Sequence, residues 1–182
     1  MKSLLQKIFG RSRAAAEASQ ASEVVIATRP RQFLLTEAVL RAIADGLSDS
    51  RVMEEEKIVF LFGTVTEEVN LVAALFKPRA QTTYGSFHVS KLAMAEVVRT
   101  ASRLGMEVVG QVHTHPGEAY HSGGDDDGTH IAYPGFLSVV VPNFGCDLPS
   151  LKGAAFYVCT GRGAFERIPD DQVLTISTYL EP

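Results

Sequence analysis

The stretch Glu107 to Asp127 reads EVVGQVHTHPGEAYHSGGDDD, and it is the most informative part of the chain. Its first eight residues are rich in β-branched side chains and predict a buried strand, which Pro116 ends. His113 and His115 stand two residues apart at the end of this strand, so their side chains share one face of the sheet. Two imidazoles at this separation can bind one metal ion, and the turn at Pro116 leaves such a site open.

A loop rich in Gly and Asp follows this strand, from Pro116 to Thr129. Asp125, the first of three consecutive aspartates, comes ten residues after His115, and a loop of that length can bring a carboxylate back to the same ion. Two His, one Asp and a water form the open, four-coordinate arrangement of a catalytic zinc site, rather than the closed arrangement of a structural one.

A site of this kind also needs a base that accepts a proton from water. Glu56 opens a predicted strand, Glu56 to Gly63, and could lie beside the strand that carries the histidines. Two alternatives remain open: Glu54 to Glu56 could be a solvated charge run, and the histidines could be unrelated residues at a polar sheet edge. The HxHP motif together with an upstream Glu and a downstream Ser-x-x-Asp indicates a catalytic metal site far more specifically than HxH alone.

The rest of the chain predicts an α+β fold, sandwich-like, in which helices flank a mixed central β-sheet. Amphipathic helices are predicted over 36–48 and 90–104, and strands over 24–28, 56–63, 68–77, 107–114, 136–141, 154–159, 165–168 and 173–178. The first helix should bury Leu35, Val39, Leu40, Ile43 and Leu47, and the second should bury Leu92, Val97, Val98 and Ala101. The strands 56–63 and 68–77 should form a hairpin.

Length and composition favour one cytoplasmic domain, residues 24–182, preceded by a tail, residues 1–23. The formal net charge of −4 does not favour a nucleic-acid binder, and two cysteines cannot build a Cys-rich zinc site or a disulfide framework. No apolar run approaches the roughly 18 residues that a membrane span needs. The basic tail, with Lys2 and Lys7 among Leu and Ile residues, is either a frayed linker or an amphipathic docking helix.

Other HxH metal sites fit this chain poorly. Hydrolases of the metallo-β-lactamase type use HxHxD, but Gly117 stands where that Asp would be. Amidohydrolases carry HxH on a barrel of about 250 residues, which is longer than this chain. The helical HExxH motif is absent from the sequence.

The combination of Glu56, His113-Thr114-His115-Pro116 and Ser122-Gly123-Gly124-Asp125 resembles the JAMM signature of the JAB/MPN metalloproteases. Glu56 lies seven residues before Gly63, as in the Glu-x₆-Gly strand of that family, and the resemblance covers roughly residues 33–160. It implies an MPN/cytidine-deaminase-like fold. The chain is most similar to bacterial members that accompany ubiquitin-like, E1-like and E2-like proteins.

One departure from the family pattern affects the third metal ligand. The family usually has seven residues between the second His and the Ser, whereas this chain has six between His115 and Ser122. Keeping the Ser-x-x-Asp relation makes Asp125 the ligand, and this reading is favoured because a loop loses a residue more easily than a hydroxyl donor. Keeping the His-to-Asp distance makes Asp126 the ligand and places Gly123 at the position of the Ser.

The resemblance implies a zinc-dependent isopeptidase or peptidase that cleaves after the C-terminus of a ubiquitin-like protein. Zinc would be held by His113, His115 and Asp125 or Asp126; Glu56 would transfer the proton, and Ser122 would hydrogen-bond the oxyanion. The expected partners are the ubiquitin-like protein, its conjugates and E1-like or E2-like proteins. The alternatives are a catalytically silent MPN-like scaffold, which usually lacks one of these residues, and a metallohydrolase of a small amide.

Other residues near the motif carry weaker signals. His121 and His130 flank the aspartates and could modulate them, although histidines in loops are more often solvated bystanders. The segment Tyr84 to Phe87 is predicted from its position to line the substrate groove.

Overall fold

The computed structural model describes residues 32–122, 131 and 133–177. The predicted tail 1–23, the predicted strand 24–28 and the candidate ligands Asp125 and Asp126 lie outside the described residues, as does His130.

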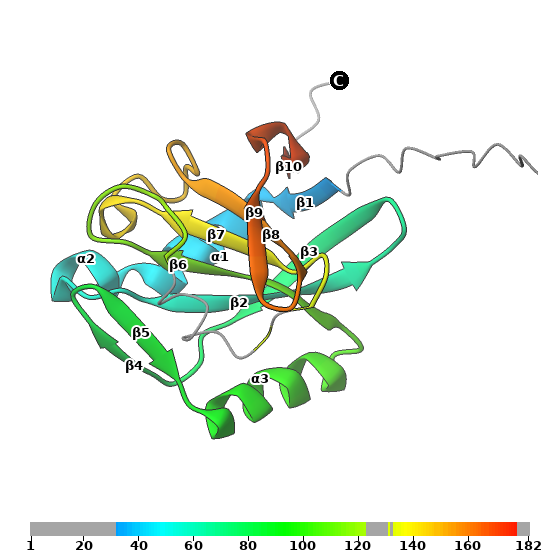
Figure 1. Cartoon of the computed structure of the whole chain (residues 1–182), viewed down its shortest axis with the longest axis horizontal. Coiled ribbons are helices and arrows are strands. Elements are labelled where there is room, and N and C mark those ends of the chain that lie inside the picture. The colour runs from blue at the N-terminus through cyan, green and yellow to red at the C-terminus, as the bar shows by residue number, and fades with distance from the viewer. Residues whose placement is uncertain (1–31, 123–130, 132, 178–182) are drawn as a thin grey trace, which may run out of the picture.

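One mixed sheet organises the described part of the chain, with eight strands in the order β10-β1-β3-β2-β6-β7-β8-β9 (Figure 1). The strands are β1 Gln32–Thr36, β2 Ile58–Val65, β3 Val69–Phe76, β6 Glu107–Thr114, β7 Leu137–Val141, β8 Ala155–Gly161, β9 Ala164–Arg167 and β10 Val173–Ile176. Strand β6 lies near the centre, antiparallel to β2 and parallel to β7. The predicted α+β class with a mixed central sheet is therefore confirmed.

Helices cover both faces of the sheet, which explains why its central strands β2, β6 and β7 are buried along most of their length. The helices are α1 Glu37–Leu47, α2 Asp49–Met53 and α3 Lys91–Arg103, with short 3₁₀ turns η1 Asn143–Gly145 and η2 Asp170–Gln172. On β2, Val59 and Leu61 pack in the core cluster that contains the buried residues of α1. Its alternate residues, Phe60 and Phe62, pack in the cluster of α3 and of the separate hairpin formed by β4 Ala80–Thr83 and β5 Ser86–Val89.

The two predicted long helices are present and begin at side-chain caps. The Oγ1 atom of Thr36 accepts a hydrogen bond from the Val39 amide at 3.2 Å, and the Oγ atom of Ser90 accepts one from the Ala93 amide at 3.3 Å. The predicted buried face of α1 is confirmed at Val39, Leu40, Ile43 and Leu47, whereas Leu35 is buried in strand β1, before the helix begins.

The predicted buried face of α3 is wrong at two positions. Leu92 is 80% exposed and Val98 is 50% exposed, while Ala93 and Met94 are buried beside the correctly predicted Val97 and Ala101. Because apolar residues occur around much of this helix, the periodicity alone permits more than one inward face. Packing against the hairpin residue Phe87, in the same core cluster, selects the observed one.

The predicted strands that fall within the described residues are present, including the antiparallel pairing of β2 with β3 and the edge positions of β9 and β10. Strand β2 begins at Ile58, two residues later than predicted, because Glu56 instead donates its amide to Thr83 O at 2.8 Å. The prediction omitted β1, α2 and the β4–β5 hairpin. Strand β1 depends on parallel pairing with β3 and β10, which are distant in sequence, so its local pattern is weak.

Gly63 marks a point where only glycine fits in the sheet. The register of β2 against β3 shifts between Phe62 and Gly63, and a Cβ atom on Gly63 would lie 1.9 Å from Leu71 O. The glycine seven residues after Glu56 therefore permits close approach of two backbones, and it sets the path of the strand that follows Glu56.

Candidate active site

The centre of the candidate site is the end of β6, where the structure brings His113 and His115 together on one face of the sheet. Both are buried, with 0% and 4% of their surfaces exposed, and their ring centroids lie 5.1 Å apart. The strand positions the first imidazole, and the backbone of the second is held by its amide donating to Val141 O at 2.8 Å. Phe87 of β5 lies against His113 with a centroid distance of 5.1 Å.

Glu56 lies on the neighbouring segment, just before β2. Since Ile58 pairs with His113, the residues that precede β2 come beside the end of β6. The Oε1 atom of Glu56 is 3.8 Å from Nε2 of His115, and Glu56 is only 3% exposed. The solvated charge run considered for Glu54 to Glu56 is thus not the arrangement of Glu56, although Glu54 itself is exposed.

A cavity of about 330 Å³ opens directly onto these groups. Its lining residues are Glu56, Tyr84, Gly85, His115, Pro116, Gly117, Glu118, Tyr120 and Ser122. Of the segment predicted to line a groove, Tyr84 and Gly85 do so, whereas Phe87 is buried against His113. Ser122 shares this cavity with Glu56 and His115, as the motif requires.

The donor set present here fits a metal ion as far as the structure describes it. Two imidazoles that share a tetrahedral ion, at metal–nitrogen distances of about 2.0 Å, place their ring centroids about 5 Å apart. The observed 5.1 Å between His113 and His115 matches that spacing. Within residues 32–122, 131 and 133–177 no group of three metal-binding side chains occurs, and both candidates for the third ligand, Asp125 and Asp126, lie outside those ranges.

Thr114, between the two histidines, points to the opposite face and ties β6 to the segment that carries Glu56. Its Oγ1 atom accepts a hydrogen bond from the Lys57 amide at 2.9 Å and lies 2.6 Å from Ser50 Oγ. Ser50 Oγ in turn donates to Glu55 O at 2.6 Å. Ser50 and Thr114 are both fully buried, so these hydroxyls bond to protein groups rather than to bulk water.

We expect Thr114→Val to lower the free energy of unfolding by about 1–3 kcal/mol, because the part-buried Lys57 amide and the buried Ser50 hydroxyl would each lose a hydrogen-bond partner. Urea denaturation followed by circular dichroism measures this change. Thr114→Ser, which keeps the hydroxyl, is the matched control and should cost less. A Thr114→Val variant as stable as the wild type, or one more stable than Thr114→Ser, would contradict a stabilising role for the hydroxyl.

A second polar cluster holds the β4–β5 hairpin against the segment 55–57. Lys57 Nζ donates to Glu55 Oε2 at 2.6 Å, and Thr82 Oγ1 donates to the same oxygen at 2.6 Å. The hydrogen bond from Lys57 holds the pKa of the Glu55 carboxyl below its ordinary value, and the hydroxyl of Thr82 lowers this pKa further. The hairpin that forms one wall of the cavity is therefore anchored next to Glu56.

This anchoring predicts a pH dependence of stability. Because the Glu55 pKa is depressed in the folded protein, its stabilisation is present above the ordinary carboxyl pKa of about 4.3 and is lost as the pH falls through the folded value. We expect Glu55→Gln to lower the Tm at pH 7, and the difference from the wild type to shrink below about pH 4. Thermal unfolding at both pH values, with the exposed Glu96→Gln as control, measures this. A difference that persists unchanged in acid contradicts the assignment.

His121 is the residue near the site that the sequence interpretation missed. Its ring is not that of a solvated bystander, because it stacks on Phe165 at 4.4 Å, contacts Tyr157 at 5.2 Å and lies 6.4 Å from the ring of His113. These contacts attach the segment before Ser122 to strands β8 and β9. No local pattern indicates them, because both aromatic partners are more than thirty residues away in the sequence.

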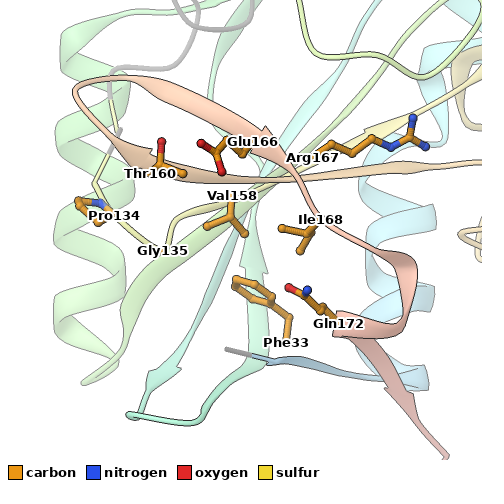
Figure 2. A pocket seen from close by; sticks show the side chains of 9 residues that line it. All are labelled: Phe33, Pro134, Gly135, Val158, Thr160, Glu166, Arg167, Ile168 and Gln172. Carbon is orange, nitrogen blue, oxygen red and sulfur yellow. The ribbon is translucent and has the colours of Figure 1, made fainter. Parts of the chain in front are cut away.

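A second cavity of about 390 Å³ lies between β1, β8–β9 and the segment that leads to β10 (Figure 2). Figure 2 shows Phe33, Val158 and Ile168 pointing toward one another in it, while Arg167 extends away. None of the predicted site residues that the structure describes lines this cavity. The candidate chemistry therefore belongs to the smaller cavity beside His115.

Comparison with known proteins gives a family match and a fold match. The model of prokaryotic homologs of the JAB domain matches residues 36–151. The probable metalloprotease y4jG of Sinorhizobium fredii is 35% identical over 65 residues, which are 36% of this chain. The matched region spans only 40% of the length of that curated relative.

Two solution structures are similar in fold. A protein from Desulfitobacterium hafniense matches with a TM-score of 0.59 and 13% identity, over 80% of this chain and 93% of that one. A protein from Salinibacter ruber matches with a TM-score of 0.51 and 25% identity, over 74% of this chain and 91% of that one. In the part of the chain that the structure describes, no helix is both long and apolar enough to cross a membrane.

Proposed function

Because the chain belongs to the family of prokaryotic homologs of the JAB domain, we propose that it is a zinc-dependent peptidase that cleaves after the C-terminal tail of a ubiquitin-like protein. The main support for this proposal is the position of Glu56 beside the two histidines at the end of β6. The Glu56 carboxylate lies 3.8 Å from His115 at the floor of a cavity of about 330 Å³. The proposed substrates are isopeptide-linked conjugates of the ubiquitin-like protein and its linear precursors.

His113, His115 and one aspartate, Asp125 in preference to Asp126, would hold the zinc. When bound, zinc supplies Lewis-acid chemistry that makes water nucleophilic near neutral pH. The Glu56 carboxylate accepts the proton of the attacking water and later delivers it to the leaving amine. The burial of Glu56 limits competing hydration of the carboxylate.

Ser122 and the backbone around the histidines complete the proposed machinery. Ser122 lines the same cavity, where its hydroxyl can donate a hydrogen bond to the oxyanion that forms at the cleaved carbonyl. The amide of Phe144 donates to His115 O at 2.7 Å, and the amide of Asn143 donates to Gly117 O at 3.0 Å. These bonds hold the rim at residues 115–117 in place before substrate arrives, which reduces the reorganisation needed for catalysis.

The ubiquitin-like substrate rests on the resemblance of the Glu56, His-Thr-His-Pro and Ser-x-x-Asp motif to that of bacterial JAMM proteins. The name of the Sinorhizobium fredii relative supports the peptidase chemistry and leaves its substrate unspecified. A ubiquitin-like substrate would place the reaction in the cytoplasm. E1-like and E2-like proteins of the same conjugation system are then the expected partners.

Metal removal tests the proposal directly. We expect the purified protein to hold about one zinc per chain, as measured by elemental analysis, and to release the tag from a ubiquitin-like fusion. A chelator should abolish release, and added zinc should restore it. A correctly folded chain that holds no metal would exclude an enzyme of this kind. Metal-dependent hydrolysis of small amides without cleavage of any fusion would support the proposed metallohydrolase chemistry and contradict the proposed ubiquitin-like substrate.

A further inference from the structure

The outer part of the cavity beside His115 carries three side chains that the proposed chemistry does not use. Tyr84 and Tyr120 line it with 62% and 57% of their surfaces exposed. Glu118, which is also exposed, lines it between Gly117 and Tyr120 in the sequence. Two large aromatic rings left open to solvent beside a reactive centre are available for contact with a substrate.

Both tyrosines are attached to the same framework as the candidate catalytic groups. The ring of Tyr84, at the tip of the β4–β5 hairpin, meets Phe144 edge-on at 5.5 Å and 75°. The amide of Phe144 donates to His115 O, and the amide of Glu56 donates to Thr83 O, next to Tyr84. The ring of Tyr120 meets the His115 ring at 5.0 Å and 84°. The outer part of the cavity is therefore fixed relative to the reacting atoms.

The charged side chains that the structure describes in the lining of this cavity have one sign, opposite to that of the proposed zinc ion. Glu56 and Glu118 line it, and no Lys or Arg occurs among the described residues that do so. Lys57, the nearest cation in the sequence, directs its Nζ atom to Glu55 and Thr82 instead. Carboxylates together with the faces of tyrosine rings attract cations and disfavour anions.

We propose that Tyr84, Glu118 and Tyr120 bind a cationic side chain of the substrate, within two residues of the cleaved bond. Arginine is the preferred residue, because its planar guanidinium can stack on a tyrosine ring while it pairs with a carboxylate. This inference rests on the proposed peptidase function and adds a sequence preference to it. Glu118 and the two tyrosines are specificity residues and take no part in the chemical step.

The first experiment compares fluorogenic peptides that differ at a single residue, occupied by Arg, Gln or Glu, at each of the two positions on either side of the cleaved bond. With the zinc-loaded full chain, we expect kcat/KM to be about tenfold higher for Arg than for Gln at one of these positions, and lower again for Glu. Glu118→Gln and Tyr84→Ala should each reduce the Arg preference to about threefold or less. Tyr84→Phe, which keeps the ring, and Glu166→Gln, in the other cavity, should retain it. A chain that cleaves all three peptides equally, or a preference that survives both Glu118→Gln and Tyr84→Ala, overturns the inference.

The second experiment measures binding without cleavage. Fluorescence anisotropy of the same peptides with the Glu56→Gln protein should show the Arg preference, and raising the salt concentration from about 0.05 to about 0.5 M should weaken it. An Arg preference in binding, with neither a peptide nor a ubiquitin-like fusion cleaved by the wild type, would retain this inference and overturn the proposed function. Cleavage without an Arg preference would overturn this inference alone, and the absence of both would overturn both.

Discussion

Glu56→Gln is expected to lower the rate of cleavage of a ubiquitin-like fusion by about 100- to 10,000-fold, the usual contribution of a positioned general acid–base group. Glutamine matches glutamate in size but cannot accept the proton. Glu56 is 3% exposed and its carboxylate lies 3.8 Å from His115, beside the proposed zinc ligands. Zinc content should stay at the wild-type level, since Glu56 is not among the proposed ligands. Steady-state kinetics and elemental analysis of the same preparation measure both quantities.

Glu54→Gln is the matched control for this variant, because Glu54 is two residues away and exposed. It removes the same charge and should cleave at nearly the wild-type rate. Cleavage that survives in Glu56→Gln would remove Glu56 from the mechanism. Loss of zinc together with activity would instead make Glu56 part of the metal site.

The second large effect is expected at the third metal ligand. Asp125→Asn should reduce the zinc content from about one per chain to less than about one in ten, because a catalytic zinc site usually depends on three protein ligands. Asp126→Asn should retain the metal. This expectation follows from the Ser-x-x-Asp spacing, counted from Ser122, which lines the cavity. Elemental analysis after dialysis measures the metal content.

Asp127→Asn controls for the loss of one negative charge in the same run of aspartates, and circular dichroism checks that each variant folds. The opposite pattern, with metal lost only in Asp126→Asn, would make Asp126 the ligand and place Gly123 at the position of the Ser. Retention of zinc in both single variants would contradict the assignment of either aspartate as an essential ligand.

Local sequence patterns predicted those parts of the fold that local interactions determine. The strand over Glu107–Thr114 was predicted with the bounds it has, because a β-branched run that ends before proline specifies a strand without help from distant residues. Apolar spacing predicts the helices α1 and α3, together with the Thr36 cap for α1 and the stop at Gly105 for α3. In contrast, β1 and the inward face of α3 depend on pairing and packing with segments far along the chain. The prediction omitted β1 and was wrong for Leu92 and Val98 of α3.

For the site, the sequence by itself determined which residues carry the motif and that His113 and His115 share a face, since strand alternation requires it. Only the tertiary structure placed Glu56 within 3.8 Å of His115, tied Thr114 to Ser50, and stacked His121 on Phe165. It alone placed Tyr84 and Tyr120 in one cavity. The physical reason is that the pattern of a strand or helix reports which side is buried, whereas distances between side chains on different elements are set by how those elements pack.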